Sequence, residues 1–380
     1  MQLFTECLIP ALNNYGNPQL MAPSQYSLGL MGIIVSSPRM NNETTQVVKK
    51  LLASPQKVAI VGHKNPDGDA IGSCLGLSFF LKSQGHSATV IMPNDFPDFL
   101  KWLPGCDEIV IYEKEVENSK KIFEKADIIF TLDFNSLDRV GGELQSVLEN
   151  AAAKFVMIDH HQQPADYAVA TYSDVKMSST SEMVYHFMDA MDQAEKLSKE
   201  IAVNLYTGIM TDTGSFRFSS TTPTTHRVAA KLIEAGAQSA IINQNVYDTN
   251  SSERMKLLGV ALNNLVILPE LHTAYITLTQ KELDDHNFKK GDTEGFVNYA
   301  LSVKGIVFAA IFIENKQESI VKISFRSKGN FSVNDFARNH YSGGGHINAA
   351  GGKSSQDLNN TINEFISILP RYKNALTNAL

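Results

Sequence analysis

The pattern of apolar and polar positions in this chain changes once, near residue 263. Before that point, short apolar runs alternate with stretches whose apolar residues recur at helical spacing. Short apolar strands that alternate with helices are typical of a parallel sheet with helices on both faces, so we predict an α/β domain over residues 41–237. Its expected strands are residues 57–61, 88–92, 126–133 and 154–159, and its main helices are residues 70–83, 179–190, 197–211 and 224–235.

The second part of the chain has the pattern of half-buried strands. A mostly helical connector is expected at residues 238–262. Apolar and polar residues then alternate in three segments, which predicts strands at residues 272–279, 305–314 and 319–327. We therefore expect a smaller α+β domain over residues 263–375.

The first forty residues differ from both parts. They contain no lysine or arginine before Arg39, and Asn, Gly and Pro interrupt their apolar stretches. A secretory signal needs a basic start and an apolar core, so this segment does not fit one. We predict a poorly ordered extension over residues 1–40, and we hypothesise that translation begins at Met40.

Composition narrows the class of protein. The 380 residues suit two domains, and 43% hydrophobic with 19% charged residues is typical of a soluble globular chain. The net charge of −7 argues against general binding of polyanions, so a nucleic-acid contact would need a local basic patch. Three widely spaced cysteines suit a reducing cytoplasm. The sequence has no apolar run of about 18 residues, so we expect no membrane span.

Candidate chemistry lies where the expected elements of the α/β domain end. In parallel α/β sheets, ligands bind outside the carboxyl ends of the strands. Four clusters of acidic and histidine residues follow such ends: His63, Asp67 and Asp69; Asp133; Asp159, His160 and His161; and Asp212.

Each cluster also has an ordinary structural explanation. Asp67-Gly68-Asp69 could be a turn, and Asp133 or Asp212 could cap a helix. So many acids converging on one rim would repel one another without cations, however. Mixed carboxylate and imidazole ligands suit Mn²⁺, Mg²⁺, Fe²⁺ or Co²⁺, and two ions about 3.5–4 Å apart would use the whole set.

These motifs resemble those of a known superfamily. "HKNPDGDAIGS", "TLDFNS", "DHH" and "TDTGSF", in this order, are similar to the four signature motifs of the DHH phosphoesterases over residues 55–225. The resemblance implies two divalent metal ions, with Mn²⁺ expected and Mg²⁺ or Co²⁺ as alternatives. It implies that His63 and Asp67 ligate the first ion, that Asp69, His160 and Asp212 ligate the second, and that Asp133 bridges both.

The same resemblance assigns roles beside the metals. It implies a catalytic set of Asp133, Asp159 and His161, in which Asp159 orients His160 and His161 faces the substrate phosphate. A hydroxide held by the two metals would attack phosphorus.

The glycine-rich segment of the second region resembles a DHHA1 domain, which follows DHH domains across a cleft. Gly343-Gly344-Gly345-His346 and the AAG at 349–351 match its motif, with Ser342 where the family commonly has glycine. The resemblance implies that Arg326, Gly344, Gly345 and His346 bind the nucleotide substrate. Phe331 and Tyr341 could stack on a base, but we expect both in the core.

The expected function follows from this family. Length and motifs favour the stand-alone nanoRNase and pAp phosphatase (NrnA-type) group over RecJ-like exonucleases, membrane-anchored cyclic dinucleotide phosphodiesterases and family II pyrophosphatases. We expect hydrolysis of short oligoribonucleotides to mononucleotides, of 3'-phosphoadenosine 5'-phosphate (pAp) to AMP, or both. The alternatives are a phosphodiesterase for cyclic or linear dinucleotides such as pApA, and a non-catalytic nucleotide-binding protein. Whether the chain forms a homodimer is left open.

Overall fold

The computed structural model describes residues 40–379. The predicted extension and the hypothesis about its translation start therefore lie outside the described residues, except for Met40, whose side chain is buried in the first core. None of the helices within residues 40–379 combines the length and the apolar character needed to cross a membrane.

The first region is built on a parallel sheet of six strands in the order β3-β2-β1-β4-β5-β6. Successive side chains of a strand point to opposite faces, so Val58 and Ile60 enter one core while Ala59 and Val61 enter the other. Both faces are therefore apolar, as the sequence predicted. The strands are β1 (Lys57–Val61), β2 (Ser87–Met92), β3 (Val110–Ile111), β4 (Ile128–Leu132), β5 (Lys154–Asp159) and β6 (Ala170–Ser173).

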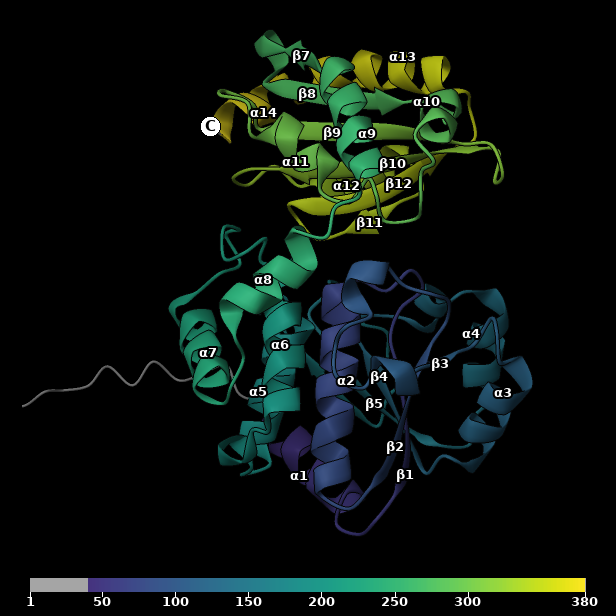
Figure 1. The fold of residues 1–380 in the computed structure, drawn as a ribbon, viewed down its shortest axis with the longest axis vertical. Coiled ribbons are helices and arrows are strands. Elements are labelled where there is room, and N and C mark those ends of the chain that lie inside the picture. Colours follow the sequence, from purple (N-terminus) through teal and green to yellow (C-terminus); the bar gives the residue numbers. More distant parts are fainter. Residues whose placement is uncertain (1–39, 380) are drawn as a thin grey trace, which may run out of the picture. The chain divides into compact units, whose positions relative to one another are not determined.

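Helices cover both faces of this sheet (Figure 1). The larger core packs against α1 (Asn42–Leu51), α2 (Gly68–Ser83), α5 (Thr180–Ala190), α6 (Lys199–Asp212) and α7 (Pro223–Glu234). The smaller core packs against α3 (Val116–Lys125) and α4 (Gly142–Glu149).

Helices α2 and α6 approach each other closely because glycines line their contact. A Cβ atom at Gly72 would lie 2.5 Å from the Asn204 carbonyl oxygen, and one at Gly76 would lie 2.5 Å from the Leu205 side chain. The obstacle at Gly72 is backbone, so the close approach requires glycine there, whereas at Gly76 the end of the Leu205 side chain would have to shift. The close contact brings the start of α2, with Asp69, next to the end of α6, with Asp212.

The second region contains a mixed sheet in the order β11-β12-β10-β9-β8-β7. Only β8 and β9 pair in parallel; the other neighbours are antiparallel. The strands are β7 (Val266–Leu268), β8 (Thr273–Leu278), β9 (Phe308–Asn315), β10 (Ile320–Ser327), β11 (Gly344–Gly345) and β12 (Ala349–Ser354). The helices are α9 (Ser252–Asn263), α10 (Gln280–Asp285) and α11 (Phe296–Leu301) in one core, and α12 (Val333–His340), α13 (Leu358–Ile368) and α14 (Lys373–Asn378) in the other.

The predicted fold class is confirmed, and the differences lie in short elements. The edge strands β3, β6 and β7 were not predicted, because two to four residues give too little periodicity to detect. The glycine-rich segment forms β11 and part of β12, which were not predicted either.

The expected connector contains two helices that pack in different places. Helix α8 (Ser239–Tyr247) contributes Ile242 and Val246 to the core of the first region, whereas α9 contributes Leu257 and Leu258 to the second. We retain residues 41–237 and 263–375 as the proposed domains, with these helices as extensions of their cores.

Candidate active site

The four predicted clusters come together at one edge of the parallel sheet. Strand β1 has β2 on one side and β4 on the other, so the strand order changes direction between β1 and β4. Such a switch point leaves a crevice at the carboxyl ends of the strands. His63 and Asp67 follow β1, Asp133 follows β4, and His160 follows β5. Asp212 is the last residue of α6 and adds a further carboxylate.

Two of the four groups of neighbouring ligand atoms in residues 40–379 contain the predicted metal ligands. One atom each from His63, Asp67 and Asp133 lie within 4.8 Å of one another. The ligand atoms of a second group, Asp69, His160 and Asp212, also lie within 4.8 Å of one another. Each group contains the residues that the family resemblance assigned to one ion, and both could hold a divalent cation.

Asp133 belongs to the first group and also faces the second. Its Oδ2 is 3.5 Å from His63 Nε2, and its Oδ1 is 3.4 Å from His160 Nε2. The residue is buried, and its φ of 64° is left-handed, a conformation that aspartate tolerates better than most residues. This backbone turn directs the carboxylate into the space between the histidines.

Hydrogen bonds fix which nitrogen each histidine presents. His63 Nδ1 lies 2.9 Å from the Lys64 carbonyl oxygen, and His160 Nδ1 lies 3.2 Å from the Met177 carbonyl oxygen. When Nδ1 donates to a carbonyl, Nε2 keeps its lone pair for a metal. Both Nε2 atoms face the carboxylates, as metal ligands should.

Several carboxylates crowd together at this site. Burial and the charges of Asp133 and Asp212 raise the pKa of Asp69 well above its ordinary value. Burial and the charge of Asp133 also raise the pKa of Asp212 to about 6, although His160 lowers it. Burial would raise the pKa of Asp133 too, but hydrogen bonds with His160 and His63 hold it well below the usual range. Divalent cations would relieve this repulsion.

The start of helix α5 supports the carboxylates, which the sequence did not predict. The Thr180 amide donates to Asp69 Oδ2 at 2.6 Å, and the Ser181 amide donates to Asp69 Oδ1 at 2.9 Å. The Thr180 hydroxyl donates to Asp133 Oδ1 at 2.9 Å. Free amides at a helix N-terminus favour a negative charge, so this helix end orients two acidic side chains at once.

A buried glutamate anchors the same helix end. Glu182 is 1% exposed and accepts hydrogen bonds from the hydroxyls of Ser178 and Thr225, the latter at 2.9 Å. The Ser179 side chain caps α5 by accepting from the Glu182 amide at 3.0 Å. The segment from Met177 to Ser181 is therefore held rigidly behind His160, Asp69 and Asp133.

Replacing Thr180 with valine should weaken metal binding. Valine has a similar shape but lacks the hydroxyl, so Asp133 Oδ1 loses its donor while the helix remains. Changes to residues that orient metal ligands typically cost 10- to 100-fold in metal affinity, and we expect roughly tenfold for Mn²⁺ in calorimetric titration. Thr180→Ser keeps the hydroxyl and should bind Mn²⁺ nearly as the wild type does; equal affinity in the valine variant would contradict the orienting role.

The predicted hydrogen-bond partner of Asp159 was not the one that the structure shows. Asp159 was expected to orient His160, but its Oδ1 lies 2.7 Å from His161 Nδ1. His160 is instead oriented by the Met177 carbonyl. The rings of His160 and His161 are neighbours, 5.1 Å apart between centroids, but it is His161 whose Nδ1 meets the Asp159 carboxylate. Asp159 therefore holds His161, the histidine expected to face the phosphate.

His346 of the glycine-rich segment lies against the DHH histidines. Its ring centroid is 4.3 Å from that of His161 and 4.5 Å from that of His160. Burial, and then the charges of His160 and His161, lower its pKa well below the ordinary value. A neutral imidazole is therefore expected at this position.

Two residues that the sequence did not single out help to place His346. Asn334 accepts through Oδ1 from the Gly345 amide at 2.9 Å, and its Nδ2 donates to Gln162 Oε1 at 3.0 Å. Asn334 thus links the glycine-rich strand to the residue that follows the DHH motif. Gly344 pairs with Gly351 in the same sheet, and Ser342 adopts a left-handed φ of 45°, which glycine would accept more readily.

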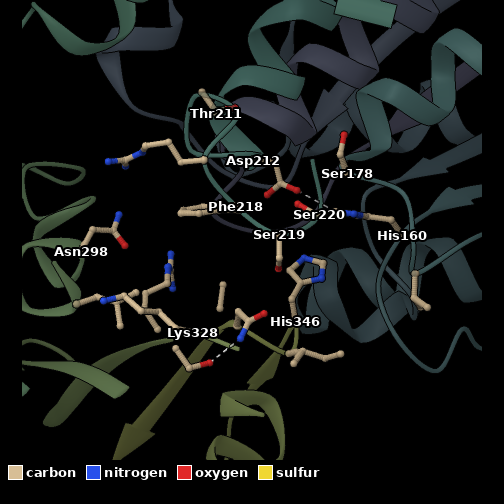
Figure 2. A pocket seen from close by; sticks show the side chains of 18 of the residues that line it. His160, Ser178, Thr211, Asp212, Phe218, Ser219, Ser220, Asn298, Lys328 and His346 are labelled. Atoms are coloured by element: carbon tan, nitrogen blue, oxygen red, sulfur yellow. Dashed lines mark hydrogen bonds and ion pairs between the residues drawn. The ribbon is translucent and has the colours of Figure 1, made fainter. Parts of the chain in front are cut away.

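Arg326 lines a cavity beside the acidic groups. The cavity has a volume of about 720 Å³, and its lining includes Asp67 and Arg326. Figure 2 shows His160, Asp212 and His346 in the same lining. Arg326 Nε is buried and meets no hydrogen-bond partner within residues 40–379. An unpaired donor of this kind is suited to an anionic ligand.

Phe331 and Tyr341 are both buried in the second core, as expected.

This fold and site define a class of protein: an α/β phosphoesterase with acidic and histidine groups that could bind divalent metals. Sequence comparison agrees. The profile of the DHH family, N-terminal domain, matches residues 57–209, and that of the DHHA1 domain matches residues 270–372. The chain therefore belongs to the DHH family of phosphoesterases.

The chain is also similar to individual proteins of this family along most of its length. The bifunctional oligoribonuclease and PAP phosphatase NrnA of Thermus thermophilus is 32% identical over 315 residues, which cover 83% of this chain and 89% of that protein. The cyclic-di-AMP phosphodiesterase PdeA of Listeria monocytogenes is 25% identical over 80% of this chain but only 46% of its own length. Among solved structures, an exopolyphosphatase-related protein from Bacteroides fragilis is 38% identical, with a TM-score of 0.85, over 89% of this chain and 98% of that one.

Proposed function

We propose that this protein hydrolyses short oligoribonucleotides to mononucleotides, pAp to AMP, or both. The observation that carries the proposal is the pair of ligand groups around Asp133, which open onto a cavity with an unpaired arginine donor. The similarity to the NrnA protein along most of both chains supports the substrate class.

The donor set fits two divalent ions. Carboxylate oxygens and imidazole nitrogens without thiolates suit Mn²⁺, with Mg²⁺ or Co²⁺ as alternatives. His63 and Asp67 would hold one ion, Asp69, His160 and Asp212 would hold the other, and Asp133 would contact both. Bound there, the ions would lower the pKa of water and neutralise charge on the phosphoryl oxygens.

The chain's other residues would act on the substrate. His161, held through Nδ1 by Asp159, would present Nε2 to a phosphoryl oxygen and stabilise the charge that develops on it. Arg326 and His346 would bind a nucleotide phosphate, with Gly344 and Gly345 allowing the backbone to approach it closely.

The runner-up is hydrolysis of cyclic or linear dinucleotides such as pApA. The relative that supports it matches this chain over less than half of its own length, whereas the NrnA relative matches over nearly its whole length. We therefore favour short RNA and pAp.

The thiols of Cys74 and Cys106 are free, which fits our proposal of a reducing cytoplasm.

Product analysis tests the proposed function. Purified protein with Mn²⁺ should release mononucleotides from RNA of two to five residues, or AMP from pAp, and chelation of the metal should abolish both reactions. Turnover of c-di-AMP with neither of these products would favour the runner-up. Binding of nucleotides without turnover in any divalent metal would indicate a non-catalytic protein.

A further inference from the structure

The cavity extends beyond the residues assigned so far. Its volume of about 720 Å³ lies in the upper part of the range for ligand pockets, about 300–1,000 Å³. One part of its wall carries Arg217, Phe218 and Ser219, which follow α6, and Asn298, which lies on α11. Neither the metal chemistry nor the proposed phosphate contacts use these residues.

The turn that carries Phe218 is strained. Gly214, Ser215 and Phe216 have consecutive left-handed φ angles of 56°, 59° and 64°. The Thr213 hydroxyl accepts from the Phe216 amide at 3.0 Å, and the Phe216 ring stacks on His226 at 5.3 Å between centroids. Strained backbone of this kind persists only when its surroundings fix it, and it concentrates at ligand sites.

The turn fixes the position of the Phe218 ring. A Cβ atom at Gly214 would lie 2.6 Å from the ring, so the ring packs directly on the glycine backbone. The neighbouring Arg217 is anchored through Nε to the Gly214 carbonyl at 2.9 Å, and its guanidinium is exposed. The strained turn therefore places a half-buried aromatic ring and a cation next to each other at the cavity.

Asn298 supplies a polar group in the same part of the cavity. Its Oδ1 is buried and has no hydrogen-bond partner in the part of the chain that the structure describes. Figure 2 shows Phe218 and Asn298 on the side of the pocket opposite His160. A buried amide oxygen without a partner is costly unless a ligand or water satisfies it.

We propose that Phe218 and Asn298 form a subsite for one base of a short single-stranded RNA, with Arg217 and Lys328 near its flanking phosphates. This inference rests on the proposed function and deepens it. An aromatic face stacks on any base, and a side-chain amide can both donate to and accept from a base edge. The exposed residues Arg217 and Lys328 line the same cavity in a chain with a net charge of −7, and Lys328 Nζ donates to the Ile306 carbonyl oxygen at 2.9 Å. A ring, an amide and two cations suit a nucleotide better than a simple anion.

The test combines a protein change with a substrate change. The substrates are 5'-phosphorylated RNA trimers, either complete or lacking the base at position one, two or three. Phe218→Ala should lower kcat/KM for the complete trimer on the order of tenfold, since stacking contributes about that much per base. For the trimer that lacks the stacked base, the same substitution should have little effect, and the position of that base identifies the subsite.

Matched variants separate stacking from general apolar contact. Phe218→Trp retains an aromatic face and should stay within a few-fold of the wild type, whereas Phe218→Leu should behave like the alanine variant. Asn298→Ala should alter the relative kcat/KM for trimers with different bases at the identified position. Mn²⁺ affinity, measured by calorimetry, should remain unchanged in all four variants.

Two kinds of result would overturn the inference. One is a loss in Phe218→Ala that is equal for complete and base-free trimers, which would indicate a structural role. The other is no loss at all. Failure of the proposed function is recognised separately, because the wild-type protein itself would then cleave neither the trimers nor pAp.

Discussion

Replacing Asp133 with asparagine is expected to lower kcat/KM on the order of a thousandfold or more. Asp133 contacts the histidines of both ligand groups, and asparagine keeps only one neutral carboxamide oxygen, so it cannot present a charged oxygen to each proposed metal position. Charge stabilisation by bound metals contributes several kcal/mol to such reactions, and about 4 kcal/mol corresponds to a thousandfold. Steady-state kinetics over a range of Mn²⁺ concentrations, with calorimetric titration of Mn²⁺, measures both effects.

The choice of asparagine follows from the backbone at position 133. The left-handed φ of 64° is tolerated by asparagine, whereas alanine would add strain there. Asp133→Ala should therefore lose activity to a similar degree but unfold at a lower temperature than Asp133→Asn. Near-normal turnover by either variant at saturating Mn²⁺ would show that Asp133 does not bridge two metals.

Replacing Arg326 with alanine should weaken nucleotide turnover roughly 10- to 150-fold. A hydrogen bond to a charged group contributes about 1.5–3 kcal/mol, which gives this range in kcat/KM. The Arg326 side chain lines the cavity and its Nε lacks a partner within residues 40–379, so its expected partner is a substrate phosphate. Kinetics with pAp and with short RNA measures the loss.

Two comparisons isolate the role of Arg326. Bis-p-nitrophenyl phosphate lacks the nucleotide groups, so its slow hydrolysis should suffer much less, and Mn²⁺ binding should remain intact. Arg326→Lys keeps a positive charge but loses the planar pair of donors, and it should fall between the wild type and the alanine variant. Equal losses for the nucleotide and for the simple ester would mean that the arginine has a structural role.

Much of this protein was predictable because its signals are local. The strands β1, β4 and β5 are short apolar runs, and the residue types that follow them are metal-binding types in a fixed order. Parallel strands place their carboxyl ends at one edge, so the convergence of His63, Asp133 and His160 followed from the pattern alone. The burial of Phe331 and Tyr341 was also anticipated.

Other features depend on contacts between distant parts of the chain. Asp69 and the Thr180 amide are 111 positions apart, and nothing in the local sequence of either residue indicates their hydrogen bond. The local sequence also did not indicate that His161, rather than His160, would meet the Asp159 carboxylate. The link from Gln162 to Asn334 joins positions 172 residues apart.

The sequence by itself therefore determined the fold class, the family and the candidate metal ligands, because periodicity and residue type carry that information. The tertiary structure decided how those ligands are oriented and what surrounds them. The orientation of Asp69 and Asp133 depends on hydrogen bonds from the start of α5. One wall of the cavity depends on the strained turn at residues 214–216, where the Phe218 ring packs on Gly214. Such contacts form only when separate elements pack together, so no short stretch of sequence encodes them.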